Sequence, residues 1–156
     1  MPLSIRTNAG FVTAIGLAVT LVVTACSSLQ RGTPDDVDRA AFDDLREAVT
    51  ETIDNPARQA RALEALNAVE RDFAALRLAL ENRRVEFRAL YLNYDATRPQ
   101  FESLLDRHDF EIRAARRRVT ESHRGFVAAT TDEEWTSLAK AKTQATDTLL
   151  KSLQSI

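Results

Sequence analysis

The chain of 156 residues contains one cysteine, four glycines and four prolines, and these scarcities exclude several classes of protein. A single thiol cannot form an intramolecular disulfide, so no disulfide framework holds the fold. After Pro34 the only glycine or proline residues are Pro56, Pro99 and Gly125. The long segments between them are rich in Ala, Leu, Arg and Glu, which favours helices. No Gly-rich phosphate loop and no Ser-His-Asp signature occurs, so we expect neither enzyme activity nor a bound cofactor.

The amino-terminal segment ends in a short motif around the only cysteine. Arg6 is the only charged side chain before Arg31, and residues 9–23 form an uncharged, mostly apolar run, as in an export signal. The run leads into Val23, Thr24, Ala25 and Cys26. This motif resembles the lipobox of bacterial lipoproteins, in which an aliphatic residue, more often Leu than Val, and two small residues precede the cysteine.

The resemblance implies that the chain is cleaved before Cys26, that the thiol is diacylglyceryl-modified and that the new amino group is acylated. Residues 1–25 are then the signal peptide, 26–32 a lipidated linker and 33–156 the exported domain. Each buried methylene adds ~0.8 kcal/mol to membrane binding, so several acyl chains anchor the protein firmly. Ser27, in place of Asp, resembles the outer-membrane sorting pattern of Gram-negative lipoproteins. We therefore expect a periplasm-facing protein of the outer rather than the inner membrane.

Two other interpretations of this segment stay open. The apolar run could remain as a membrane helix, but spanning a bilayer takes about 20 apolar residues, and this run is short and rich in Gly, Thr and Ala. Cys26 could instead be a thiol that follows an ordinary signal peptide.

Helix start signals divide the rest of the chain. Thr33 precedes Pro34 and two aspartates, Asn55 precedes Pro56, and Thr131 is followed three residues later by Glu134, as in a capping box. These signals predict a first helix that ends near Asp54 and a second that follows directly. The second helix is expected to reach a turn at residues 95–99, the third to continue to about residue 130, and the fourth to start after Thr131.

The second and third helices carry a seven-residue repeat of mostly apolar residues. In the second these are Ala62, Leu66, Val69, Phe73, Leu76, Leu80, Arg83, Phe87, Leu90 and Tyr94, and in the third Phe101, Leu105, His108, Ile112, Ala115, Val119, Ser122, Phe126 and Ala129. Spacings that alternate between four and three are typical of a coiled-coil seam. Counting from the turn pairs Tyr94 with Phe101, Leu90 with Leu105 and Phe87 with His108, in an antiparallel hairpin roughly 55 Å long.

The predicted fold is therefore an all-α, up-down helical bundle of three to four helices, built on a long antiparallel coiled-coil-like hairpin. The first helix is expected along residues 56–76 and the fourth along residues 108–130. The fourth presents one apolar face, made of Trp135, Leu138, Ala145, Leu149 and Leu153. Beyond the two flanking helices, the turn end of the hairpin should project as a bare two-helix arm.

A second apolar series lies opposite the seam of the second helix. Leu78, Val85 and Leu92 recur every seven residues, and such a stripe favours a partner or dimer interface on the arm. Leu78 could lie under the first or fourth helix, and Leu104 and Phe110 of the third helix are assigned to the same surface. The alternative is that these are scattered exposed apolar residues, which are common on proteins.

Charge is distributed unevenly along the chain. Residues 33–54 carry eight acidic and two basic side chains, net −6, whereas residues 55–130 carry 11 acidic and 14 basic, net +3. We interpret this as an acidic first helix against an Arg-rich hairpin, and it gives no support for a nucleic-acid partner. Arg113, Arg116, Arg117 and Arg124 form a possible contact patch for anionic lipid headgroups or an acidic protein. The alternative is pairing with Asp109 and with the acidic helices.

His108 and Arg83 are polar residues on the apolar seam. A di-metal bundle needs Glu-x-x-His pairs, but Leu105 precedes His108, and Thr120 precedes His123, at the required spacing. We therefore expect His108 to be a hydrogen-bonded core residue rather than a metal ligand. Arg83 should extend past its hydrophobic stem to Glu111 or Glu86, and Gly125 should accommodate close packing.

These features predict a lipid-anchored protein of the cell envelope with a structural or adaptor role, which binds a protein partner or itself through helix faces. The alternative is a periplasmic chaperone, or a sensor of amphipathic ligands or envelope stress.

Overall fold

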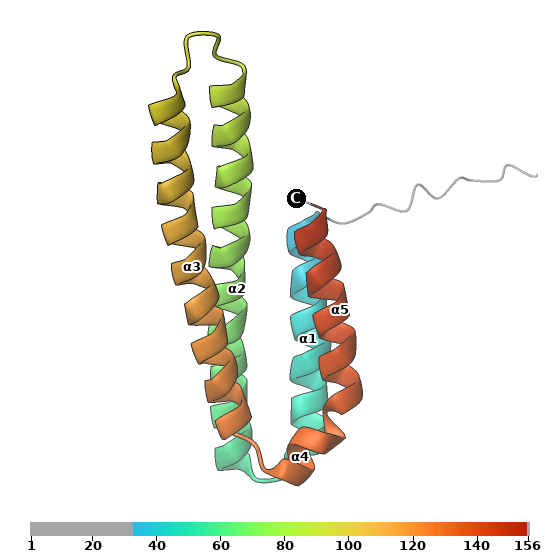
Figure 1. Ribbon diagram of the computed structural model, residues 1–156. Coiled ribbons are helices and arrows are strands. Elements are labelled where there is room, and N and C mark those ends of the chain that lie inside the picture. The colour runs from blue at the N-terminus through green and yellow to red at the C-terminus, as the bar shows by residue number, and fades with distance from the viewer. Residues whose placement is uncertain (1–32, 156) are drawn as a thin grey trace, which may run out of the picture. The chain divides into compact units, whose positions relative to one another are not determined.

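The computed structural model describes residues 33–155, and this region is helical with no strand. Five helices follow one another along the chain (Figure 1). They are α1 (Pro34–Thr52), α2 (Pro56–Tyr91), α3 (Arg98–Ala128), α4 (Asp132–Ser137) and α5 (Ala139–Gln154). The prediction of an all-α helical bundle is confirmed. The expected fourth helix is divided into α4 and α5 at Leu138.

The predicted start signals form the expected caps. The Asp36 amide donates to the Thr33 hydroxyl at 3.3 Å, and the Thr33 amide donates to the Asp36 carboxylate at 2.9 Å. The Thr131 and Glu134 pair repeats this reciprocal box at 3.2 and 2.8 Å, and the Asn55 side chain accepts from the Arg58 amide at 3.0 Å. Hydrogen bonds from Thr33 and Thr131 to the ionised carboxylates lower the pKa values of Asp36 and Glu134.

The helices are arranged as two antiparallel pairs. α2 and α3 form the long hairpin, whereas α5 runs beside α1 rather than along α3 (Figure 1). The prediction that the fourth helix packs along residues 108–130 is therefore wrong. Small side chains on the facing surfaces, such as Ala41 and Ala145, are buried and let α1 and α5 approach closely. α4 links the two pairs and places Trp135 5.7 Å from Phe126 of α3, measured between ring centroids.

One main core joins both pairs at the end of the hairpin away from its turn, and we call this region the base. Its buried residues are Ala41, Phe42, Leu45, Val49, Ile53, Ala62, Leu66, Phe73, Phe126, Leu138 and Ala145. Val49, Ile53 and Leu66 are almost completely inaccessible to solvent. Full burial of such a side chain stabilises the fold by about 1.5–3 kcal/mol, so the base contains most of the hydrophobic stabilisation.

Beyond the base the hairpin depends on its own seam. Leu76, Ile112 and Ala115 form a second, smaller core, and Phe87 continues it with its ring centroid 6.5 Å from that of His108. We call the part from Phe87 through the turn to His108 the arm, and its helices extend past the ends of α1 and α5 (Figure 1).

The seam departs from the predicted repeat near the turn. α2 ends at Tyr91, so Tyr94 lies in the turn, is fully exposed and does not pair with Phe101. Leu104 is buried, whereas Leu105 is exposed, which reverses the expected assignment of these two residues. A straight helix drifts by about 20° per heptad relative to a strict 3.5-residue repeat. The buried position therefore shifts by one residue over the length of α3.

A polar group is buried among α1, α2 and α5. Asp38 is 7% exposed, Arg77 places its Nε 3.5 Å from the Asp38 carboxylate and also pairs with Asp35, and Ser152 of α5 is buried beside them. Burial raises the pKa of Asp38, and the neighbouring Ser152 hydroxyl opposes this shift. Arg77 thus binds acidic α1 as the charge distribution predicts. A second ion pair between these helices has the opposite polarity, because Arg46 of α1 pairs with Glu70 of α2.

Candidate functional site

The apolar series on α2 is exposed to solvent. Leu78, Val85 and Leu92 are 57%, 66% and 63% exposed, and we call them the apolar face. Leu78 is therefore not covered by α1 or α5. Phe110 of α3 is also exposed, whereas Leu104, which was assigned to the same surface, is a core residue.

Val85 lies where the apolar face meets the ends of the flanking helices. It lines a cavity of about 390 Å³ together with Arg88, Pro34 at the start of α1 and Ser155 after α5. The ends of α1 and α5 therefore reach α2 at this level. Leu92 lies seven residues, or about 10 Å, farther along the arm, beyond the reach of either helix.

A mostly apolar pocket of about 370 Å³ lies between the hairpin and the end of α5. Leu80, Phe87, Leu105 and Leu153 form its walls, and the side chains of Arg83 and Arg84 border it. Its volume is at the lower end of the range for small-molecule sites. An apolar wall next to guanidinium groups suits a ligand with a hydrocarbon portion and an anionic group.

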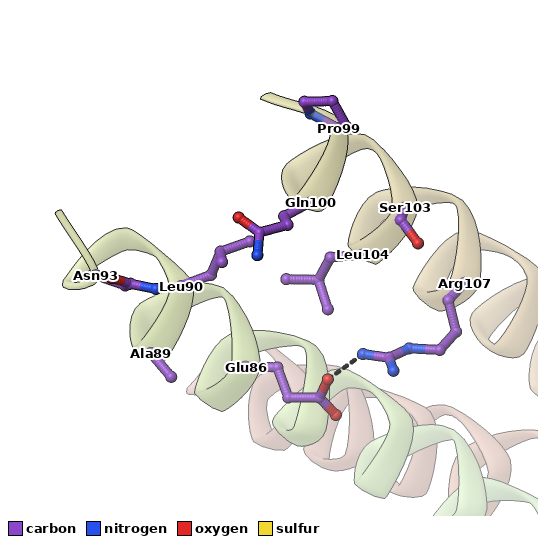
Figure 2. A pocket seen from close by; sticks show the side chains of 9 residues that line it. All are labelled: Glu86, Ala89, Leu90, Asn93, Pro99, Gln100, Ser103, Leu104 and Arg107. Carbon is purple, nitrogen blue, oxygen red and sulfur yellow. Dashed lines mark hydrogen bonds and ion pairs between the residues drawn. The ribbon is translucent and has the colours of Figure 1, made fainter. Parts of the chain in front are cut away.

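A larger groove of about 630 Å³ lies near the tip of the arm (Figure 2). Leu104 projects between the two helices, and the ion pair between Glu86 and Arg107 closes one end of the groove. Asn93 and Gln100 supply amide groups near the turn. The groove is shallow and of mixed polarity, which suits a contact with a peptide better than an enclosed small molecule.

His108 is buried in the hairpin seam, with 1% of its surface exposed. Its Nε2 lies 3.6 Å from a Glu86 carboxylate oxygen, and its Nδ1 lies 3.3 Å from a Glu111 carboxylate oxygen. Neither ring nitrogen makes a hydrogen bond within residues 33–155. His108 is therefore a core residue, as predicted, but the prediction that it is hydrogen-bonded is wrong. In the described region no group of three or more His, Cys, Asp or Glu residues is arranged to hold a metal ion.

The arginines of α3 were expected either to contact an anion or to pair internally. Asp109 pairs with Arg83 at 3.7 Å rather than with Arg113, which also corrects the expected partners of Arg83. Arg118 lies 3.9 Å from Asp72. All four members of the predicted patch are exposed and form no ion pair with another residue of the described region: Arg113, Arg116, Arg117 and Arg124.

Other site predictions have different outcomes. A Cβ at Gly125 would meet no atom within 4 Å, so close packing does not require this glycine. Cys26 and its flanking residues Val23, Thr24 and Ala25 lie outside the described residues. Among the described helices, none is long and apolar enough to cross a membrane.

The structure also reveals a site that the sequence analysis missed. α1 and α5 border an acidic groove of about 570 Å³, lined by Asp44, Glu47 and Glu51 from α1 and by Asp147 and Lys151 from α5. The spacing of the three α1 acids, three and four residues apart, was the available signal. Its significance depended on knowing that α5 lies beside α1.

Comparison with known proteins does not assign the chain to a family. No protein-family model, curated protein or solved structure matches the chain.

Proposed function

We propose that this protein is a lipoprotein of the cell envelope, anchored through Cys26, that acts as an adaptor by binding another protein through the apolar face of α2. The anchor follows from the lipobox-like motif in the sequence. The adaptor role rests on what the helical domain offers, which is helix surfaces rather than an enclosed polar site. On this proposal the base is the rigid support, and the apolar face, which runs from Leu78 to Leu92 in the arm, presents the contact surface.

The single observation that supports this role best is the exposure of the apolar face. Leu78, Val85 and Leu92 lie on one side of α2 at seven-residue spacing, and each exposes more than half of its surface. Apolar side chains at this spacing supply one of the two positions per heptad that line a helix-packing seam. Isolated apolar residues are common on protein surfaces, but three in register on one side of α2 form a row that a partner helix can follow.

Substitution of two face residues by lysine tests the proposal. Val85→Lys with Leu92→Lys places two charges on the contact line, so the full chain should lose its partner in pull-downs while its helix content and melting temperature stay unchanged. Ala57→Lys with Ala60→Lys adds the same charge to exposed positions of α2 in the base and should retain the partner. Retention of the partner by both variants would eliminate the apolar face as the adaptor surface.

A second candidate function is sensing of an amphipathic anion, and the pocket between the hairpin and α5 favours it. Leu153 of α5 and Leu105 of α3 both line it, so a ligand would contact both helix pairs at once. Titration of the full chain with a fatty acid, followed by the fluorescence of Trp135 or by thermal shift, would detect such binding. Leu153→Lys should abolish it, whereas the Val85→Lys and Leu92→Lys variant should retain it.

A further inference from the structure

One face of α3 is an exposed arginine stripe. Arg113, Arg117 and Arg124 follow one another at spacings of four and seven residues, and Arg116 flanks them. These spacings place the side chains on one side of the helix, opposite the buried residues Ile112, Ala115 and Phe126. The nearest acidic residues do not neutralise the stripe. Asp109 is paired with Arg83, and Glu121 forms no ion pair within the described region.

The acidic groove between α1 and α5 is the complementary surface. Its carboxylates belong to Asp44, Glu47, Glu51 and Asp147, with Lys151 as the one basic residue that lines it. None of the four acids forms an ion pair within residues 33–155. Ala41 and Ala48 form part of the groove between them, so no bulky side chain prevents a helix from approaching the carboxylates.

The two surfaces match in spacing as well as in sign. Arg117 and Arg124 are seven residues apart on α3, and Asp44 and Glu51 are seven residues apart on α1, so both pairs are separated by about 10.5 Å along their helices. The four-residue step from Arg113 to Arg117 likewise equals the step from Glu47 to Glu51. These are two alternative registers, and each of them places two guanidinium groups of the stripe opposite two carboxylates of the groove.

The two surfaces do not meet within one molecule. The stripe lies on the side of α3 opposite its buried residues, and α5 runs beside α1 rather than along α3 (Figure 1). No ion pair of the described residues joins the stripe to the groove. We infer that the arginine stripe of one copy docks in the acidic groove of a second copy. Because the two patches differ, the contact is heterologous. The pair keeps a free groove on one copy and a free stripe on the other, and both can accept further copies. The inference does not depend on the adaptor role of the apolar face.

The same stripe has the chemistry to contact a membrane of anionic lipid, since arginine binds phosphate well. Charge complementarity within the molecule favours the second copy. A membrane would engage the stripe but would leave the acidic groove unused and repelled from the lipid surface. The two occupants therefore differ in whether the groove matters, and this difference is what the experiment measures.

Charge reversal of each surface provides the test. The full chain in a non-ionic detergent would be studied by sedimentation velocity at about 50 mM and about 500 mM NaCl, because salt screens contacts between exposed charges. We expect concentration-dependent association at low salt, with an apparent dissociation constant at least about tenfold higher at high salt. Arg117→Glu with Arg124→Glu, and Glu47→Arg with Glu51→Arg, should each abolish self-association. An equimolar mixture of the two variants should associate again, because each supplies the charges that the other has reversed.

Several results would overturn the inference. These are a wild-type chain that stays monomeric, association that salt does not weaken, or failure of the mixed variants to associate. The membrane alternative would appear as loss of binding to vesicles of anionic phospholipid in the Arg117→Glu and Arg124→Glu variant, with no effect of the groove variant on association. Circular dichroism melts of both variants establish that they fold, since all four positions are exposed. Val85→Lys with Leu92→Lys should associate as the wild type does, which separates this contact from the apolar face.

Discussion

The base and the arm share helices α2 and α3, but their side chains are buried to different extents. In the base α2 packs against α1 as well as α3, so Leu66 is almost completely buried. Toward the turn α2 packs mainly against α3, so Phe87 and Leu90 remain partly exposed on the seam and Val85 and Leu92 are largely exposed on the other side. The comparison shows that stability and available contact surface are separated along one hairpin. The base stabilises the fold, and the rest of the hairpin presents unburied apolar surface.

The largest effect is expected from a cavity in the base. Leu66→Ala removes a side chain that is 1% exposed, and substitutions of this kind in a packed core cost about 2–5 kcal/mol of the free energy of unfolding. Leu92→Ala on the arm is the matched control, because it removes the same atoms from a residue that is 63% exposed, and it should change stability by about 0.5 kcal/mol or less. Urea unfolding monitored by circular dichroism measures both. Equal losses would contradict the separation of base from arm.

A smaller effect is expected within the arm itself. Leu104→Ala should cost about 2 kcal/mol, at the low end of the range for core truncations because the site borders an open groove, whereas Leu105→Ala should cost clearly less. Hydrogen exchange by mass spectrometry would show whether Leu104→Ala speeds opening of residues 87–108 without affecting the base. Faster exchange with Leu105→Ala than with Leu104→Ala would restore the original heptad assignment.

Removal of a helix cap in the base should lower the free energy of unfolding by about 1 kcal/mol. Thr131→Ala removes the acceptor for the Glu134 amide, and loss of an N-cap typically costs about 0.5–2 kcal/mol. The control Thr136→Ala lies in the same helix but outside the cap and should have little effect in urea unfolding. Because the folded-state pKa of Glu134 is lowered, its contribution is present above the ordinary carboxyl range and is lost as pH falls through the folded value. The difference between wild type and Glu134→Gln should therefore shrink at low pH.

The smallest expected effect is the pH dependence of stability that comes from the buried Asp38 carboxyl. Its folded-state pKa is raised by burial, so its contribution to stability is complete below the ordinary value of 3.8 and is lost as pH rises through the folded value. Asp38→Asn cannot ionise and should lack this dependence. Thermal melts of both proteins between about pH 4 and pH 7 give the difference between their melting temperatures at each pH. This difference should change with pH. A difference that stays constant with pH would contradict a buried, ionising Asp38.

The sequence predicted the helices and the hairpin well because their signals are local. Thr33, Asn55 and Thr131 cap helices through residues three positions away, and the repeat from Ala62 to Phe87 identifies the seam on α2. The placement of α5 beside α1 was not predictable in this way, since it depends on which apolar faces meet after the chain has turned. For the same reason the buried Asp38 and Ser152 and the acidic groove were missed. The shift from Leu105 to Leu104 was missed because a heptad count ignores helical drift.

Site-specific photocrosslinking in intact cells tests the central claim most directly. A photoreactive residue at Leu92, with a control at exposed Glu64 of the base, would be followed by mass spectrometry of the products. The account predicts one discrete product from Leu92 and none from Glu64, because the arm presents the contact surface. A product from Glu64 but not from Leu92, a smear of many products from Leu92, or no product from Leu92 would contradict it.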